Sequence, residues 1–181
     1  MKRNTVFNLL PQYTISCCLY LFTLFTFSQT DIFEVSRSGT LEDIESIYKT
    51  NPELINTQNE SGYSPLTLAC YRGNTAVAKF LAKKVKDINT GSKFGTPLMA
   101  ATYKGYTDIV EVLLNNDAKT DLQDQNGETV AHYAVFFKKY NIIKLLVAAE
   151  TNFDIPNARG QTAKDYAKMY NQEKINELLN L

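Results

Sequence analysis

The sequence predicts an all-α fold, a solenoid of stacked helix-turn-helix units. Two observations lead to this fold class. First, glycines recur at intervals of 33, 32 and 33 residues, at Gly62, Gly95, Gly127 and Gly160. Second, a hydroxyl residue follows each of these glycines, and apolar residues at helical spacing follow each hydroxyl residue. Repeats of this length typify proteins built from one supersecondary unit stacked on its neighbours.

Each unit opens with signals for the start of a short helix. The hydroxyl residues are Ser64, Thr96, Thr129 and Thr162. Such a side chain accepts a hydrogen bond from an otherwise unpaired backbone N–H at a helix N-terminus. Proline follows the first two of them, and it suits the first helical position because its missing N–H would be unpaired there anyway. Nine residues after the hydroxyl, Gly73 and Gly105 are expected to end the helix, because glycine tolerates the left-handed conformation.

A second helix is predicted in each unit from apolar residues at helical spacing. These residues are Val77, Ala78, Phe80 and Leu81, then Ile109, Val110, Val112, Leu113 and Leu114, then Ile142, Ile143, Leu145 and Leu146, then Ile175, Leu178 and Leu179. One such pair of helices cannot bury its own apolar face, whereas stacked pairs can.

The period and the motif TPLxxA resemble the ankyrin repeat. The best copy begins at Thr96 and reads TPLMAATYKGYTDIVEVLLNNDA. The resemblance covers about residues 30–181 and implies an ankyrin-repeat solenoid of helix-turn-helix units joined by short β-hairpins or loops. It implies units at about 30–62, 63–95, 96–127 and 128–160 and a shorter closing unit at 161–181.

The fourth unit departs from the pattern. Val130 replaces the proline and Lys138 replaces the mid-unit glycine, within an aromatic segment, residues 136–140, that reads FFKKY. Three interpretations remain open at this point: a longer first helix, a bent junction, or a hot spot for binding.

The N-terminal segment is expected to be a signal peptide rather than part of the fold. Lys2 and Arg3 precede an uncharged apolar stretch at 15–27, and the small residue Ser28 follows it. This pattern is typical of a secretory signal peptide, and the stretch is shorter than the roughly 20 residues of a membrane-spanning helix. We expect cleavage after Ser28, an ankyrin-repeat domain at 29–181, and a periplasmic or extracellular location. Alternatives are an uncleaved membrane anchor and lipidation at Cys17 or Cys18.

The composition argues against several classes of function. The chain has 19 basic and 19 acidic residues, and removal of residues 1–28 would leave 17 and 19, a net charge of −2. A general nucleic-acid binder needs a positive surplus to displace phosphate counterions. No metal or cofactor is expected, since His132 is the only histidine and a zinc site needs several ligands.

Catalysis is not expected either, because the reactive groups are few. Cys70 is the one cysteine beyond the signal peptide, and it takes the place of a small packed residue. The resemblance implies that His132 ties adjacent loops together by hydrogen bonding. A dyad of Cys70 and His132 would require contact between sites two units apart, whereas each solenoid unit touches only its neighbours.

The resemblance implies that another protein binds to the first helices and to the hairpin tips. By position in the repeat, the first-helix residues are Tyr71, Arg72, Tyr103, Lys104, Phe136, Phe137, Met169 and Tyr170. The tip residues are Glu60, Tyr63, Lys93, Phe94, Gln125, Glu128 and Arg159. Tyrosine and arginine are enriched among interface hot spots. The alternative is that the aromatic residues fill the space between the two helices of a unit.

The sequence therefore predicts a monomeric, non-catalytic protein-binding module that acts outside the cytoplasm as a scaffold, an adaptor, or an inhibitor or protector of its partner. We expect no contact with a membrane after the signal peptide is removed. A membrane-tethered adaptor is the alternative if the N-terminal segment stays uncleaved. A small-ligand-binding or enzymatic protein is a more remote one.

Overall fold

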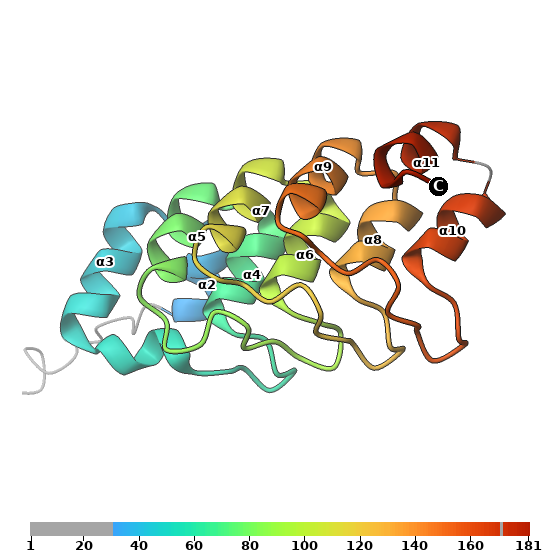
Figure 1. Ribbon diagram of the computed structural model, residues 1–181. Coiled ribbons are helices and arrows are strands. Elements are labelled where there is room, and N and C mark those ends of the chain that lie inside the picture. The colour runs from blue at the N-terminus through green and yellow to red at the C-terminus, as the bar shows by residue number, and fades with distance from the viewer. Residues whose placement is uncertain (1–30, 171) are drawn as a thin grey trace, which may run out of the picture. The chain divides into compact units, whose positions relative to one another are not determined.

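The computed structural model describes residues 31–170 and 172–181. The predicted signal peptide at 1–28 lies outside these residues. The described chain holds ten α-helices, one 3₁₀ helix and a single isolated β-bridge, between Ser92 and Gly95 (Figure 1). This confirms the all-α fold class. In the same residues, no helix has both the length and the apolar character that crossing a bilayer requires.

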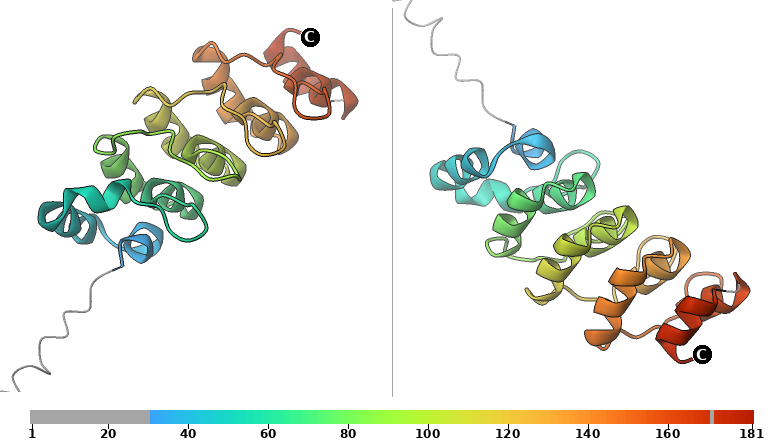
Figure 2. Two further views of the ribbon diagram at one scale, coloured as in Figure 1. Left: turned by 90° about the horizontal axis from the view of Figure 1, so that it is seen from below. Right: turned by 90° about the horizontal axis from the view of Figure 1, so that it is seen from above.

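The helices form two rows. The first helices of the units form one row, which we call the inner helices: α2 (Ile32–Ser38), α4 (Pro65–Arg72), α6 (Pro97–Lys104), α8 (Val130–Phe136) and α10 (Ala163–Met169). The outer helices are α3 (Leu41–Thr50), α5 (Thr75–Ala82), α7 (Thr107–Leu114), α9 (Tyr140–Ala148) and α11 (Glu173–Leu179), and the 3₁₀ helix η1 (Pro52–Asn56) follows α3. Each helix packs on the next member of its own row and on its partner in the other row. Figures 1 and 2 show the pairs following one another in chain order.

Three of the four predicted hydroxyl residues, Ser64, Thr96 and Thr162, cap their inner helices, whereas the hydroxyl of Thr129 lies 2.9 Å from Nδ1 of His132. The Oγ of Ser64 accepts a hydrogen bond from the N–H of Thr67 at 3.1 Å, and Thr162 accepts one from Asp165 at the same distance. In the first unit the cap is Asp31, whose carboxylate accepts from the N–H of Phe33 at 2.9 Å. Aspartate caps a helix as well as serine does.

The turn between the two helices of a unit needs a left-handed residue. Gly73 and Gly105 provide it, with φ of 75° and 87°, as the sequence predicts. In the fourth unit Lys138 adopts the same conformation, with φ of 53°. Helix α8 has 7 residues where α4 and α6 have 8, so the interpretation of a longer first helix is wrong. Packing holds this turn in shape although a side chain with a Cβ costs about 1–2 kcal/mol there.

The hydrophobic core lies between the two rows. The outer helices bury the apolar residues that the spacing picked out, such as Val77, Ile109 and Ile142, each at most 1% exposed. Fully buried alanines lie on the inner helices, among them Ala69 and Ala134. Their small side chains let neighbouring inner helices approach closely, which holds the surface between these helices in a fixed geometry.

Tight turns form the tips between units. In the tip after α7, the N–H of Asp124 donates to the carbonyl of Glu128 and the N–H of Gly127 donates to the carbonyl of Asp124, both at 3.0 Å. Neighbouring tips are also linked, since the N–H of Gln125 donates to the carbonyl of Lys93 at 3.0 Å. The tips are therefore hydrogen-bonded to one another.

Candidate functional site

Thirteen of the 15 predicted partner-binding residues are exposed. The exceptions are Tyr63, which is partly buried, and Glu128, whose side chain is only 14% exposed. Met169 is the most exposed apolar residue of the set, at 57%. The aromatic residues therefore do not simply fill the space between the helices of a unit, although their role in binding stays a prediction.

Five of these residues form an aromatic strip: Tyr71, Tyr103, Phe137, Phe136 and Tyr170. They come from the ends of α4, α6, α8 and α10. The rings of Tyr71 and Tyr103 are nearly parallel with centroids 6.3 Å apart, and Phe137 meets Tyr103 edge-on at 4.9 Å. Phe136 contacts Phe137 at 4.9 Å and Tyr170 at 5.7 Å. Each ring remains 38% to 47% exposed, so the strip offers one continuous aromatic surface.

Two of the predicted partner-binding residues are lysines whose amino groups lie over aromatic rings. The Nζ of Lys104 is 4.5 Å from the ring centroid of Tyr71 and 5.9 Å from that of Tyr103. The Nζ of Lys93 is 5.0 Å from the centroid of Phe94. These distances suit cation–π attraction. The two lysines thus place positive charge at the edge of the aromatic surface.

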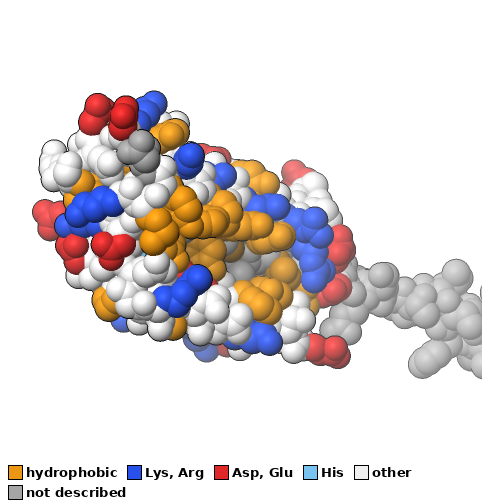
Figure 3. Space-filling model, turned by 90° about the vertical axis from the view of Figure 1, so that its right-hand side faces the viewer, with side chains coloured by type: hydrophobic (Ala, Val, Ile, Leu, Met, Phe, Trp, Pro, Cys, Tyr) orange, Lys and Arg blue, Asp and Glu red, His pale blue; other side chains and the backbone are white. Residues whose placement is uncertain are grey.

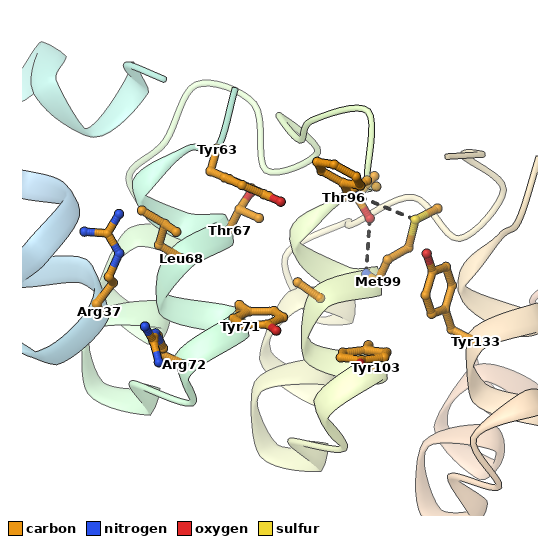
Figure 4. Close-up of a pocket in the computed structure, with 13 residues that line it drawn as sticks. Arg37, Tyr63, Thr67, Leu68, Tyr71, Arg72, Thr96, Met99, Tyr103 and Tyr133 are labelled. Carbon is orange, nitrogen blue, oxygen red and sulfur yellow. Dashed lines mark hydrogen bonds between the residues drawn. The ribbon is translucent and has the colours of Figure 1, made fainter. Parts of the chain in front are cut away.

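A groove of about 440 Å³ lies beside the strip, between α2 and α8. We call it the binding groove. Its lining includes the predicted residues Tyr63, Tyr71, Arg72, Phe94 and Tyr103. Figure 3 shows hydrophobic side chains gathered around a hollow on this face, with Lys and Arg side chains at its edge. In Figure 4, Arg37 and Arg72 lie at the α2 end of the groove and Tyr133 at the α8 end.

Several lining residues were missed by the sequence reasoning, namely Arg37, Thr67, Leu68, Met99 and Tyr133. Two signals would have found most of them. Arg37 lies two residues before Gly39, as Tyr71 lies two residues before Gly73, so the repeat register places it on the same ladder. The others precede an exposed aromatic residue by three or four positions, which puts them on the same face of a helix.

Glu128 is part of an internal network. Its carboxylate accepts hydrogen bonds from the hydroxyl of Tyr166 at 2.8 Å and from the amide of Asn157 at 3.0 Å. Burial and this carboxylate raise the pKa of Tyr166 to about 12. Arg159 lies 3.9 Å from the same carboxylate. Glu128 thus connects the fourth unit to the closing unit. Its carboxylate is held inside the protein, whereas most of the other predicted tip residues are exposed to solvent.

His132 also joins these two units. It is 1% exposed, and its Nδ1 accepts a hydrogen bond from the backbone N–H of Thr129 at 3.1 Å. Its other ring nitrogen, Nε2, lies 3.0 Å from the carbonyl of Gln161. Because Nδ1 accepts, Nε2 must carry the proton and donate to that carbonyl. The prediction that His132 ties adjacent loops by hydrogen bonding is confirmed.

Cys70 is fully buried in α4. Burial raises the pKa of its thiol well above the ordinary value, so the thiol stays protonated. Among the residues that the structure describes, no three His, Cys, Asp or Glu side chains converge as a metal site would require.

A family model described as ankyrin repeats (3 copies) matches residues 32–124 and 116–180. The chain belongs to the ankyrin-repeat family. Ankyrin-repeat proteins are in general non-catalytic modules for protein interaction, which agrees with an exposed aromatic surface and a buried histidine and cysteine.

Proteins similar in sequence to this chain occur in animals. The chain is 37% identical over 101 residues to the rat ankyrin repeat and SAM domain-containing protein 6, covering 55% of this chain and 11% of the relative. It is 32% identical over 93 residues to human protein phosphatase 1 regulatory subunit 27, covering 51% of this chain and 60% of the relative. Dauer abnormal formation protein 25 of Caenorhabditis elegans is 26% identical over 120 residues, which cover 65% of this chain and 31% of the relative. The chain thus spans less than two thirds of each of these relatives.

Proposed function

We propose that this ankyrin-repeat protein binds another protein through the aromatic strip and the binding groove, without catalysis of its own. The observation that carries the proposal is the strip itself. Five rings in contact, each 38% to 47% exposed, run across four inner helices. Large apolar patches on the surface of a monomer often mark sites of interaction with other proteins.

The strip is also prepared for binding. Its rings contact one another and lie at the ends of packed helices, so they lose little conformational freedom when a partner binds. Tyrosine and arginine, both present at the binding groove, are among the residues that contribute most to interface energy.

One relative suggests what this chain does to the protein that it binds. The name of human protein phosphatase 1 regulatory subunit 27 describes a protein that regulates an enzyme. This supports a role for the present chain in holding, inhibiting or protecting a partner protein, with the partner supplying any chemistry.

We place this function outside the cytoplasm on the strength of residues 1–28, whose basic start, apolar stretch and small residue at 28 are typical of a signal peptide. Mass spectrometry of the protein purified through a C-terminal tag tests this placement. An N-terminus at Gln29 supports export and cleavage. An intact Met1 in a membrane fraction supports the tethered adaptor instead.

The binding proposal is tested by replacing Tyr71, Tyr103 and Phe137 together with alanine. The matched control replaces Leu41 and Val147, which are 40% and 43% exposed on the outer helices. We expect the triple variant to keep the circular dichroism of the native protein but to capture no partner from the exported fraction of its source cells. The control should capture the same proteins as the native chain. Equal capture by the triple variant would refute the proposed surface.

A further inference from the structure

We propose that the binding groove takes a short extended segment of a partner protein that carries an acidic residue and, two or three positions away, a large apolar side chain. This inference rests on the proposed function and adds the chemistry of the bound segment to it. Charge, lining and length of the groove each support one part of the proposal.

The charge of the groove is positive at one end. Arg37 of α2 and Arg72 of α4 both line it, and none of the 13 lining residues is acidic (Figure 4). Lys93 and Lys104 add positive charge over the neighbouring rings. The chain as a whole has no net charge, so this is a local excess rather than the average of the surface.

Little within the protein neutralises the two arginines. Arg37 pairs with Glu34 at 3.2 Å, and the hydrogen bonds from Ser38 and Arg37 hold the pKa of Glu34 below its ordinary value. In the described part of the chain, Arg72 forms no ion pair within 4.0 Å. Within 4.0 Å, one carboxylate therefore pairs with these two guanidinium groups, while Asp31 and Glu60 line a neighbouring hollow with Arg37. A carboxylate from a partner would pair with Arg72. Arginine suits this role because its guanidinium binds a carboxylate through two parallel hydrogen bonds.

Beyond the arginines the lining becomes apolar. Leu68, Met99, Tyr71 and Tyr103 line this part of the groove, and Tyr71 and Tyr103 present nearly parallel rings. Methionine and tyrosine make favourable contacts with aromatic and aliphatic side chains. This part therefore suits one large apolar side chain.

The spacing of the helices sets the length of the segment. Packed helices lie about 8–10 Å apart, so the three steps from α2 to α8 cover about 24–30 Å. An extended chain rises about 3.3 Å per residue, which gives a segment of about seven to nine residues. The step from the arginines between α2 and α4 to the apolar part between α4 and α6 is one helix spacing, or about two to three residues.

Single-stranded nucleic acid also binds surfaces that combine arginines with aromatic rings. The overall charge favours the acidic peptide. Arg37, Arg72 and Lys104 come from three successive inner helices, but the chain as a whole has no positive surplus to attract a phosphate backbone. An oligothymidylate is therefore included in the test as a competitor.

The probe is a displayed library of random 12-residue peptides, selected on the immobilised full chain. We expect selected peptides to be enriched in Asp or Glu placed two or three residues from a Phe, Tyr, Leu or Met. Affinity for one such peptide, labelled with fluorescein, is then measured by anisotropy. Arg37→Gln combined with Arg72→Gln should weaken binding about tenfold to a hundredfold, the range expected for the loss of charge-assisted hydrogen bonds.

The matched control is Lys79→Gln combined with Lys144→Gln, which removes two exposed charges from α5 and α9 and should leave the affinity unchanged. Circular dichroism checks that all variants are folded. Selected peptides without acidic enrichment, no selected peptides, or binding that oligothymidylate displaces would each overturn the inference. Binding that the arginine variant keeps but Tyr71→Ala with Tyr103→Ala abolishes would overturn the inference and leave the proposed function standing. Binding that survives both sets of changes would overturn both.

Discussion

Replacement of His132 by alanine removes a side chain that bonds to two units at once. In the native protein its Nδ1 accepts from the N–H of Thr129 at 3.1 Å and its Nε2 donates to the carbonyl of Gln161 at 3.0 Å. The variant leaves both backbone groups without these partners. It also leaves an unfilled space, because the imidazole is 1% exposed.

The cost follows from these three losses. The N–H of the fully buried Thr129 loses its acceptor, at about 1–3 kcal/mol. The partly buried Gln161 carbonyl loses one of its two donors and keeps the N–H of Asn157 at 2.9 Å, at a cost of about 1 kcal/mol. Loss of the buried ring adds about 1–2 kcal/mol. We therefore expect His132→Ala to lower the free energy of unfolding by about 3–6 kcal/mol, a large part of the roughly 5–15 kcal/mol of a typical domain.

Urea unfolding followed by circular dichroism measures this change as a shift in midpoint. The matched control is Gln123→Ala. The side chain of Gln123 also makes two hydrogen bonds, to the carbonyls of Gly127 and Pro156, but it is exposed to water. We expect the control to lose about 1 kcal/mol or less. A loss in His132→Ala no larger than that of the control would refute the structural role of His132.

Three further predictions concern single positions. Lys138→Gly should raise the free energy of unfolding by about 0.5–1 kcal/mol, because glycine adopts the left-handed conformation without strain; Lys138→Ala should show no such gain in the same urea titration. Cys70 should resist iodoacetamide in the folded protein and react once urea unfolds it, because burial raises the pKa of its thiol; rapid alkylation of the native protein would contradict this. Hydrogen bonds from the backbone N–H and hydroxyl of Thr162 hold the pKa of Asp165 below its ordinary value. The stability that the ionised Asp165 contributes is therefore complete above the ordinary pKa and is lost as the pH falls through the lowered one. The difference in unfolding midpoint between the native protein and Asp165→Ala should accordingly shrink on acidification. A constant difference would mean that the ionised carboxylate of Asp165 does not stabilise the fold.

The helices were predictable because their signals are local. A hydroxyl residue at a helix start and a glycine at its end act within one turn of the chain, and both lie where the repeat places them, as at Ser64 and Gly73. The exposed rings of the strip followed from the same register. The fourth unit was harder, because the strain at Lys138 is outweighed by the packing of α8 on its neighbours, which no local pattern reveals.

The binding groove was only partly predictable. Tyr71, Arg72 and Tyr103 lie on the ladder of repeat positions, but the groove also depends on Met99 and Tyr133, which reach it from α6 and α8 because of the way these helices pack. If the same repeat positions had been extended to the first unit, they would have included Arg37 among the predicted residues. Glu128 shows the opposite case, since its tip position suggested exposure while its carboxylate is held by Asn157 of its own unit and Tyr166 of the closing unit.

The nearly parallel rings of Tyr71 and Tyr103 have a spectroscopic consequence. With centroids 6.3 Å apart, their electronic transitions are close enough to couple, and the coupling depends on their mutual angle. The chain contains no tryptophan, so no indole absorption obscures the tyrosine region. Near-ultraviolet circular dichroism of the unlabelled protein can therefore detect any ligand that moves these two rings relative to each other.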